Sequence, residues 1–456
     1  MKEIITQKYL DDKHTFTKIS EFFKKYRVTT ALKIANAYKH KGYSVSQLIQ
    51  YLFTLIFKNR SMYMDMLTNK NAPSFKKDTV YRFMRSIHIN WIRFTTILAK
   101  NIIETIEPLT NNERINVFII DDSMYERNRS KKVELLTKVY DHAKKAFRYG
   151  FRMLTLGWSD GNTFIPVNNI LLSSENAKNR FNEPEQADKR TSAYKRRSLS
   201  MTKATAAMLE LLKEAKKANI GASYVLFDSW FASPSTIHAV TELGYGVIAM
   251  VKKSAKMFFR YQGSDMPLTK IYTQNKKRRG RSRYLLSVIV EVMKDGMSIP
   301  AKVVYVRNRN NRKEYLCLIS TDTGMSGEEI IRIYGKRWAI EVFFKVCKSY
   351  LHLSKECHSL SYDALTAHTA VVFTRYMMLS VEERYTIDER SWGELFFYFS
   401  DELADITWIR AFYLMLDTFM NILSDRLSLT EKVLNELMDA FISSIPFELK
   451  CNLKIA

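Results

Sequence analysis

The sequence has few of the residues that mark disordered, disulfide-rich or membrane-spanning proteins. Only 14 glycines and 8 prolines occur among 456 residues, which argues against long low-complexity linkers. Four cysteines in so long a chain do not form a disulfide framework, so reduced thiols in a cytoplasm are expected. The longest apolar stretches, residues 115–121 and 369–381, are too short or too interrupted by charge to cross a bilayer. Residues 1–16 lack the apolar segment of a signal peptide.

Acidic residues are also in deficit. The chain has 47 acidic against 71 basic residues, a formal net charge of +24, which is far more than solubility requires. Such an excess indicates a polyanionic partner. Nucleic acid is the favoured partner, and an anionic membrane surface is the weaker alternative.

Residues 1–112 are expected to be almost wholly helical. Gly42 is placed to end one helix, and Ser44 is placed to cap the next. A short helix, a proline-containing turn and a helix beginning near Lys76 resemble a helix-turn-helix in outline. A plain helical bundle fits the same pattern.

From Arg114 the pattern changes to short apolar, β-branched runs between polar turns. Residues 115–123 and 223–230 each predict a buried strand with aspartate at its carboxyl end. Residues 151–173 predict two strands joined by a turn at Asp160 and Gly161. The pattern therefore indicates an α/β domain.

The second half of the chain alternates helical and strand patterns. Residues 190–221 predict a basic segment and an amphipathic helix that Gly221 terminates. Residues 256–318 alternate β-rich runs with basic turns, which predicts an antiparallel β insertion within the α/β domain. Its basic stretch 276–283 is either a DNA contact or a solvated turn. From about residue 362 the chain is expected to be helical again.

Carboxylates occur where a ligand site is expected. Asp121 and Asp122 follow one predicted strand and Asp228 follows another, and ligands of α/β sheets bind at the carboxyl ends of strands. Carboxylate oxygens suit Mg²⁺ or Mn²⁺, and two such ions can promote phosphoryl transfer. An aspartate after a strand is more often a turn or cap residue. If the site is real, one of Asp121 and Asp122 is the ligand.

A third acidic candidate lies in residues 334–348. At about 100° per residue of a single helix, Tyr334, Arg337, Glu341 and Lys348 fall on one narrow stripe. The alternative is a solvated face with a surface ion pair.

A cluster of cysteine and histidine lies nearby, at Cys347, His352, Cys357 and His358. Its spacing is not usual for zinc, and Cys347 falls on the apolar side of the predicted helix, so we disfavour a zinc site.

The four stripe residues also carry a family resemblance. Their pattern, Tyr-x2-Arg-x3-Glu-x6-Lys, resembles the signature around the catalytic glutamate in the insertion-sequence-4 family of bacterial DDE transposases. "IIDDS" resembles the first acidic motif of that family, in which the aspartate directly before Ser or Thr is the ligand, and this selects Asp122. "VLFDSWF" resembles the second motif and gives Asp228.

The resemblance implies an α/β, ribonuclease-H-like core flanked by helical regions. The core would comprise residues 113–255 and 319–385, with the antiparallel insertion at 256–318 between them. Residues 1–112 would be a helical domain that binds DNA ends, although no motif carries over to them. Residues 386–456 would form a helical C-terminal region.

The resemblance also implies the chemistry. Two Mg²⁺ or Mn²⁺ ions held by Asp122, Asp228 and Glu341 would support strand cleavage at an element end, hairpin formation and strand transfer. Tyr334, Arg337 and Lys348 would contact the DNA backbone near the cut. The partners would be double-stranded DNA of the terminal inverted repeats and of the target, bound in the bacterial cytoplasm at the nucleoid by a homodimer on paired ends. Two alternatives stay open: a ribonuclease-H-fold nuclease without strand transfer, and a decayed, non-catalytic DNA-binding relative.

Overall fold

The computed structural model describes residues 17–58, 61–68, 73–109, 114–141, 145–278, 282–308, 314–385 and 431–444. These form two compact units. One comprises the described residues within Met1–Arg27, Gln50–Pro73 and Glu389–Ala456, and the other those within Val28–Ile49 and Ser74–Asp388. The predicted boundaries at 113, 256, 319 and 386 stay predictions. Of the expected C-terminal helical region, residues 386–430 and 445–456 lie outside the described residues.

The N-terminal segment is helical, as its sequence predicts. Its helices are α2 (Thr17–Lys25), α3 (Val28–Ile34), α4 (Val45–Thr54), α5 (Met62–Thr68), α6 (Lys77–Met84) and α7 (Trp91–Ile106), followed by the 3-10 turn η1 (Glu107–Leu109). The cap at Ser44 is confirmed, because its hydroxyl accepts from the backbone N–H of Gln47, whose side chain in turn accepts from the N–H of Ser44. The helix end predicted at Gly42 is wrong. Helix α3 ends at Ile34, and Asn36 supplies the left-handed residue, with φ of 64°.

The outline of a helix-turn-helix stays untested. Helix α5 belongs to the first unit and α6 to the second, so the angle between them is not defined. Within the first unit, Phe22 and Phe23 of α2 pack on Phe53 of α4. Of the last helix, α16 (Glu431–Ser444), the side chains Leu437 and Phe441 are exposed.

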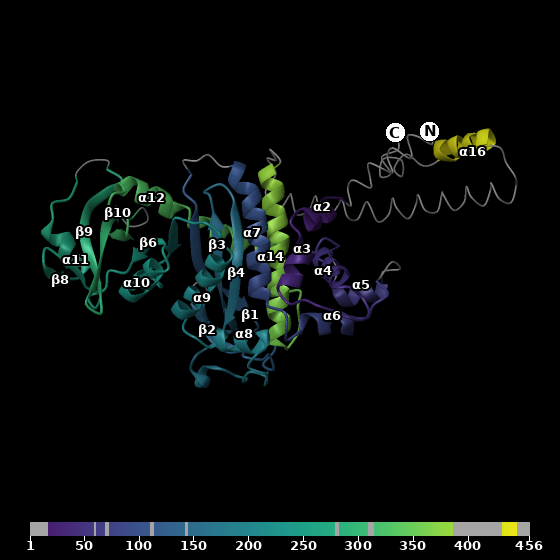
Figure 1. The fold of residues 1–456 in the computed structure, drawn as a ribbon, viewed down its shortest axis with the longest axis horizontal. Coiled ribbons are helices and arrows are strands. Elements are labelled where there is room, and N and C mark those ends of the chain that lie inside the picture. Colours follow the sequence, from purple (N-terminus) through teal and green to yellow (C-terminus); the bar gives the residue numbers. More distant parts are fainter. Residues whose placement is uncertain are drawn as a thin grey trace. The chain divides into compact units, whose positions relative to one another are not determined.

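The second unit is built on one large sheet, as Figure 1 shows. The strands are β1 (Val117–Glu126), β2 (Thr137–Asp141), β3 (Ala146–Ser159), β4 (Phe164–Leu172), β5 (Tyr224–Phe227), β6 (Gly246–Val251), β7 (Phe259–Tyr261), β8 (Ser264–Met266), β9 (Tyr284–Lys294), β10 (Met297–Arg307) and β11 (Tyr315–Ser320). They follow the order β2-β3-β1-β5-β6-β11-β10-β9-β7-β8, and β4 pairs with β3. Among the described strands, β1, β5 and β6 are mutually parallel and the other pairings are antiparallel.

The predicted insertion is antiparallel, but it does not form a separate sheet. Strands β7 to β10 and the short helix α11 (Leu268–Gln274) lie within it, and β11 pairs with both β10 and β6. The insertion therefore extends the sheet of the α/β core. Strand β11 also crosses the predicted boundary at residue 318.

Helices pack against several strands of the sheet. Helices α7, α8 (Ser192–Ser200), α9 (Ala204–Lys217) and α14 (Tyr362–Tyr385) contact β4, and α10 (Pro234–Glu242) contacts β6 and β9. The helices α7 and α14 lie side by side in Figure 1. Every residue of α14 from Tyr362 to Val381 is buried, which makes it the central helix of the unit. No described helix has the length and apolar character needed to cross a membrane.

Two turns show how well local sequence predicts a break. The turn predicted at Asp160 and Gly161 is confirmed: the Asp160 carboxylate accepts from the N–H groups of Asn162 and Thr163, and Gly161 has φ of +95°. The helix end predicted at Gly221 is wrong. Helix α9 ends at Lys217, and Asn219, with φ of 58°, takes the left-handed position.

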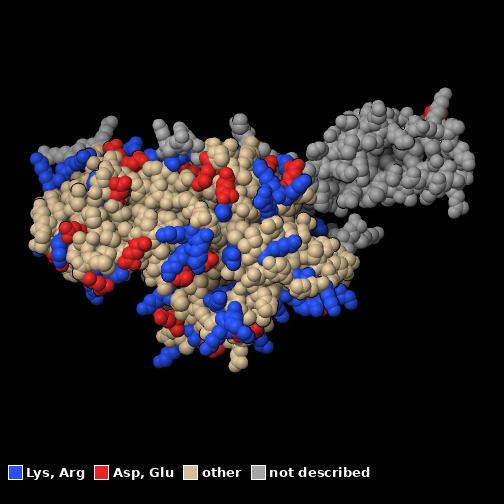
Figure 2. All heavy atoms as spheres, in the orientation of Figure 1, with Lys and Arg blue, Asp and Glu red and all other residues tan. Residues whose placement is uncertain are grey.

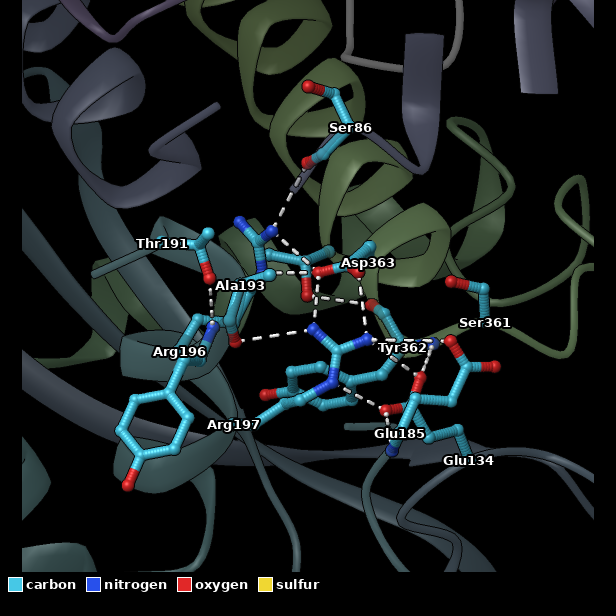
Figure 3. Close-up of polar contacts among 12 residues, drawn as sticks. Ser86, Glu134, Glu185, Thr191, Ala193, Arg196, Arg197, Ser361, Tyr362 and Asp363 are labelled. Atoms are coloured by element: carbon cyan, nitrogen blue, oxygen red, sulfur yellow. Dashed lines mark hydrogen bonds and ion pairs between the residues drawn. The ribbon is translucent and has the colours of Figure 1, made fainter. Parts of the chain in front are cut away.

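A buried ionic network joins three distant segments of this unit. In Figure 3 the Arg197 guanidinium lies between the carboxylates of Glu134 and Asp363, with Nε 2.6 Å from Glu134 Oε1 and Nη2 2.8 Å from Asp363 Oδ2. Arg196 donates to the same Asp363 and to the carbonyl of Ile89. Both arginines and both acids are buried. The network ties the segment before β2 and the start of α14 to α8.

Loss of one member of this network should destabilise the fold strongly. We expect Arg197→Ala to lower the free energy of unfolding by about 3–5 kcal/mol, because two buried carboxylates would lose their shared cation. The exposed Lys195 on the same helix is the control, and Lys195→Ala should change the free energy by about 0.5 kcal/mol or less. Urea unfolding of both variants checks this, and equal midpoints would contradict it.

Candidate functional site

The carboxyl edge of the parallel strands brings the acidic candidates together. Strands β1 and β5 run parallel up to the pair of Ile120 and Phe227. Strand β5 ends there and Asp228 follows it, whereas β1 continues along β3 to Glu126, so the prediction that Asp121 and Asp122 come after their strand is wrong and both lie within it. The Asp228 carboxylate accepts from the N–H of Trp230, 2.9 Å away, and this turn fixes its position. The site therefore rests on two buried strands.

The stripe residues come from two helices, not one. Helix α12 (Gly327–Gly335) ends just after Tyr334, and α13 (Trp338–Ser349) begins after Arg337. The prediction of one helix across residues 334–348 is wrong at Lys336 and Arg337, which form a tight turn with N–H bonds to the carbonyls three residues earlier. Helix α13 packs on β1, which sets Glu341 against the strand end.

One arginine joins this helix to the strand. Arg337 Nη1 lies 2.8 Å from Asp121 Oδ2, and its Nη2 lies 2.5 Å from Glu341 Oε1. Lys348, two turns further along α13, donates to the Ser123 hydroxyl at 2.6 Å. Asp121 and Ser123 therefore both face α13, because side chains two residues apart on a strand point to the same face.

Asp122 points to the other face of β1. Its carboxylate accepts two bonds from Arg152 of β3, at 2.8 Å from Nε and 2.5 Å from Nη2. The same guanidinium lies 5.1 Å from the centre of the Trp230 ring, and Lys252 Nζ lies 4.8 Å from it. Trp230 is 53% exposed. The structure thus separates the two neighbouring aspartates into different charge environments.

Burial changes the acid–base properties on the α13 side. Desolvation raises the pKa of Asp121 to about 7, with Arg337 opposing the rise and Asp228 and Asp122 adding to it. Desolvation also raises the pKa of Tyr334 to about 12, again against the effect of Arg337. Asp228 is therefore close enough to disfavour the charged form of Asp121, which is a condition that a bound cation relieves.

The donor set suits a divalent cation, but its present arrangement does not form a metal site. Asp121, Asp228 and Glu341 offer the hard oxygen ligands that Mg²⁺ and Mn²⁺ prefer. In the described part of the chain, no three His, Cys, Asp or Glu side chains lie close enough to hold an ion. Arg337 lies between two of the three carboxylates, so these would approach an ion only if the guanidinium moved.

Two site residues carry no signal that sequence inspection could use. Arg152 lies 30 positions after Asp122 within a strand of mixed polarity, and Trp230 resembles any aromatic residue of a turn. Their role emerges only from strand pairing, because β1 and β3 are antiparallel with Met124 opposite Arg152.

The cysteines 347 and 357 are buried free thiols.

Comparison with known proteins gives one family. A model described as DDE superfamily endonuclease matches residues 48–303, more than half of the chain. The matched segment contains Asp121, Asp122 and Asp228 and ends before Glu341. No curated protein matches the sequence.

Proposed function

Since the chain belongs to the DDE superfamily of endonucleases, we propose that it is a DNA transposase of the insertion-sequence-4 type. It binds the ends of its element and carries out metal-dependent strand cleavage and strand transfer. Enzymes of this superfamily generally use divalent metals. The observation that supports the proposal is the pairing of Arg337 with both Asp121 and Glu341, next to the strand end that Asp228 follows.

The proposed ligands are Asp228, Glu341 and one aspartate of β1. The motif selects Asp122, whereas the contacts of the structure favour Asp121, which shares Arg337 with Glu341. We propose Asp121 as the ligand and assign Asp122 to holding Arg152. Two Mg²⁺ or Mn²⁺ ions bound there would activate an attacking oxygen and stabilise the leaving one.

The residues of this chain would position the DNA around that chemistry. Arg337 and Lys348 present cations on the α13 side, and guanidinium and ammonium groups pair with phosphate oxygens. When a phosphate takes over Arg337, the carboxylates of Asp121 and Glu341 are released for metal. The centre of the Tyr334 ring lies 6.0 Å from the Arg337 guanidinium. This contact keeps the arginine beside the strand edge.

The proposed core is ribonuclease-H-like, with β1, β5 and β6 as its parallel centre and α13 as the helix that carries the glutamate.

Double-stranded DNA is the proposed partner, and the net charge of +24 supports it. Figure 2 shows clusters of lysine and arginine, with acidic residues among them, on the visible face, including the end where β9 and β10 lie in Figure 1. A homodimer on paired ends, located at the nucleoid, completes the proposal.

The DNA that flanks the coding sequence tests the transposase assignment. Terminal inverted repeats and a short target duplication are expected there. A labelled duplex of one repeat, incubated with the protein, Mg²⁺ and a plasmid, should yield labelled plasmid through strand transfer. Cleavage without any joined product would support a nuclease without strand transfer. Binding without cleavage would support a non-catalytic relative.

A further inference from the structure

The β insertion carries two lysines that are held against stacked tyrosine rings. Lys253 Nζ lies 4.8 Å from the centre of the Tyr315 ring. That ring stacks on Tyr272 with centres 4.1 Å apart and planes 25° apart, and Lys277 Nζ lies 4.6 Å from the Tyr272 ring. We call these four residues the cation–tyrosine stack. It joins the loop after β6, helix α11 with the loop that follows it, and strand β11.

The stack has a rigid base. The buried Tyr305 of β10 packs on both rings, with centres 5.1 Å from Tyr272 and 5.5 Å from Tyr315. Its hydroxyl donates to the carbonyl of Leu268 at 2.9 Å, which fixes the start of α11. The rings therefore have little freedom to move, while Lys253 at one end of the stack is exposed and Lys277 at the other is half-buried.

Contact with a ring holds an ammonium group in place without neutralising it. A cation above an aromatic face gains about 0.5–1 kcal/mol at exposed sites and keeps its full charge. A lysine held in this way has less side-chain entropy to lose when it binds an anion. The stack is thus suited to two anionic groups at fixed positions, as on a phosphodiester backbone.

The stack continues a row of cations and rings that begins at the candidate site. Lys252, next to Lys253 in the chain, lies over Trp230, and Arg152 lies over the same ring while it pairs with Asp122. Beyond Lys277, the guanidinium of Arg278 lies 4.2 Å from the centre of the Tyr284 ring. Cations therefore follow one another from the strand edge to the basic stretch of the insertion.

We propose that the cation–tyrosine stack binds the phosphate backbone of duplex DNA and guides it from the carboxylate edge across the insertion. The inference rests on the proposed function only in taking DNA as the polyanion. Lys253 and Lys277 make the phosphate contacts. Tyr272 and Tyr315 are positioning residues, because they act through the lysines.

The salt dependence of DNA binding tests this directly. The probe is a fluorescein-labelled duplex of arbitrary sequence, titrated with the full chain in EDTA at several salt concentrations. Each lost phosphate contact should reduce the slope of log K against log salt by about 0.9. We expect that reduction in Lys253→Gln and in Lys277→Gln. The control is Lys270→Gln, which removes an exposed lysine of helix α11, the helix that carries Tyr272, and should leave the slope unchanged.

Substitution of a stack tyrosine tests the proposal without changing the number of charges on the protein. Tyr272→Leu should reduce the slope although no charge is lost, and Tyr272→Phe, which keeps the ring, should bind like the wild type. Melting curves of all variants confirm that the fold is retained. An equal reduction in Lys270→Gln, or an unchanged slope in both stack lysine variants, would overturn the proposal. Wild-type protein that binds no DNA would instead overturn the proposed function.

Discussion

Asp228→Asn and Glu341→Gln are each expected to reduce DNA cleavage on the order of 10³-fold and to leave DNA binding within a few-fold of wild type. Both changes keep the size of the side chain and remove the charge that a divalent ion needs. An ion contributes several kcal/mol to the stability of the transition state, and each 1.36 kcal/mol corresponds to about a tenfold change in rate. Binding should persist because phosphate contacts elsewhere supply most of the affinity.

The measurement is single-turnover cleavage of a labelled duplex that contains one element end, beside a binding titration of the same duplex. Asp265→Asn is the matched control, since this exposed aspartate pairs with Arg260 in the insertion, away from the strand edge. Asp265→Asn should cleave the duplex at the wild-type rate. If either Asp228→Asn or Glu341→Gln cleaved at the wild-type rate, that residue would not be a ligand.

Arg337→Ala and Lys348→Ala should each lower cleavage by about an order of magnitude or more, with melting temperatures near that of the wild type. Both side chains are partly buried and bonded to β1, Arg337 to Asp121 and Lys348 to Ser123. A merely structural role for these cations would leave the reaction almost unchanged. A role in gripping phosphate beside the carboxylates would affect the rate strongly, because misplacement of the substrate slows phosphoryl transfer.

Lys345→Ala is the control for these two changes. Lys345 is an exposed lysine of α13 outside the four-residue signature, so its loss should cost less. Cleavage of the end duplex in Mg²⁺ and a melting curve are recorded for each variant. Near-normal cleavage in both Arg337→Ala and Lys348→Ala would show that these cations do not grip phosphate beside the carboxylates.

The apolar patterns predicted much of the fold, because burial selects them. The run before Asp121 begins β1, which continues to Glu126, the run before Asp228 forms β5, and the two strands around Gly161 are β3 and β4. Their alternation with helices predicted an α/β domain. The extension of the core sheet by the insertion could not be predicted, because it depends on the pairing of β11 with β6, which are distant in the sequence.

The candidate site was predictable in composition but not in contacts. The helical period correctly placed Arg337, Glu341 and Lys348 on one side, although the helix breaks before α13. The tight turn at the break rotates the chain by nearly the same angle per residue as a helix does. The choice between Asp121 and Asp122 depends on which way the strand faces. Neighbouring residues of a strand point to opposite faces, and two aspartates in succession do not reveal which side α13 covers.

The Mg²⁺-dependent cleavage of an end duplex by Asp121→Asn and Asp122→Asn, measured side by side with the wild type and with EDTA controls, decides which carboxylates hold the ions. The contacts of Arg337 predict that wild-type cleavage requires Mg²⁺, that Asp121→Asn abolishes it and that Asp122→Asn retains a measurable rate. Full activity of Asp121→Asn together with loss in Asp122→Asn would show that the motif, and not the geometry, identifies the ligand. Wild-type cleavage in EDTA would contradict a metal-dependent site at this strand edge altogether.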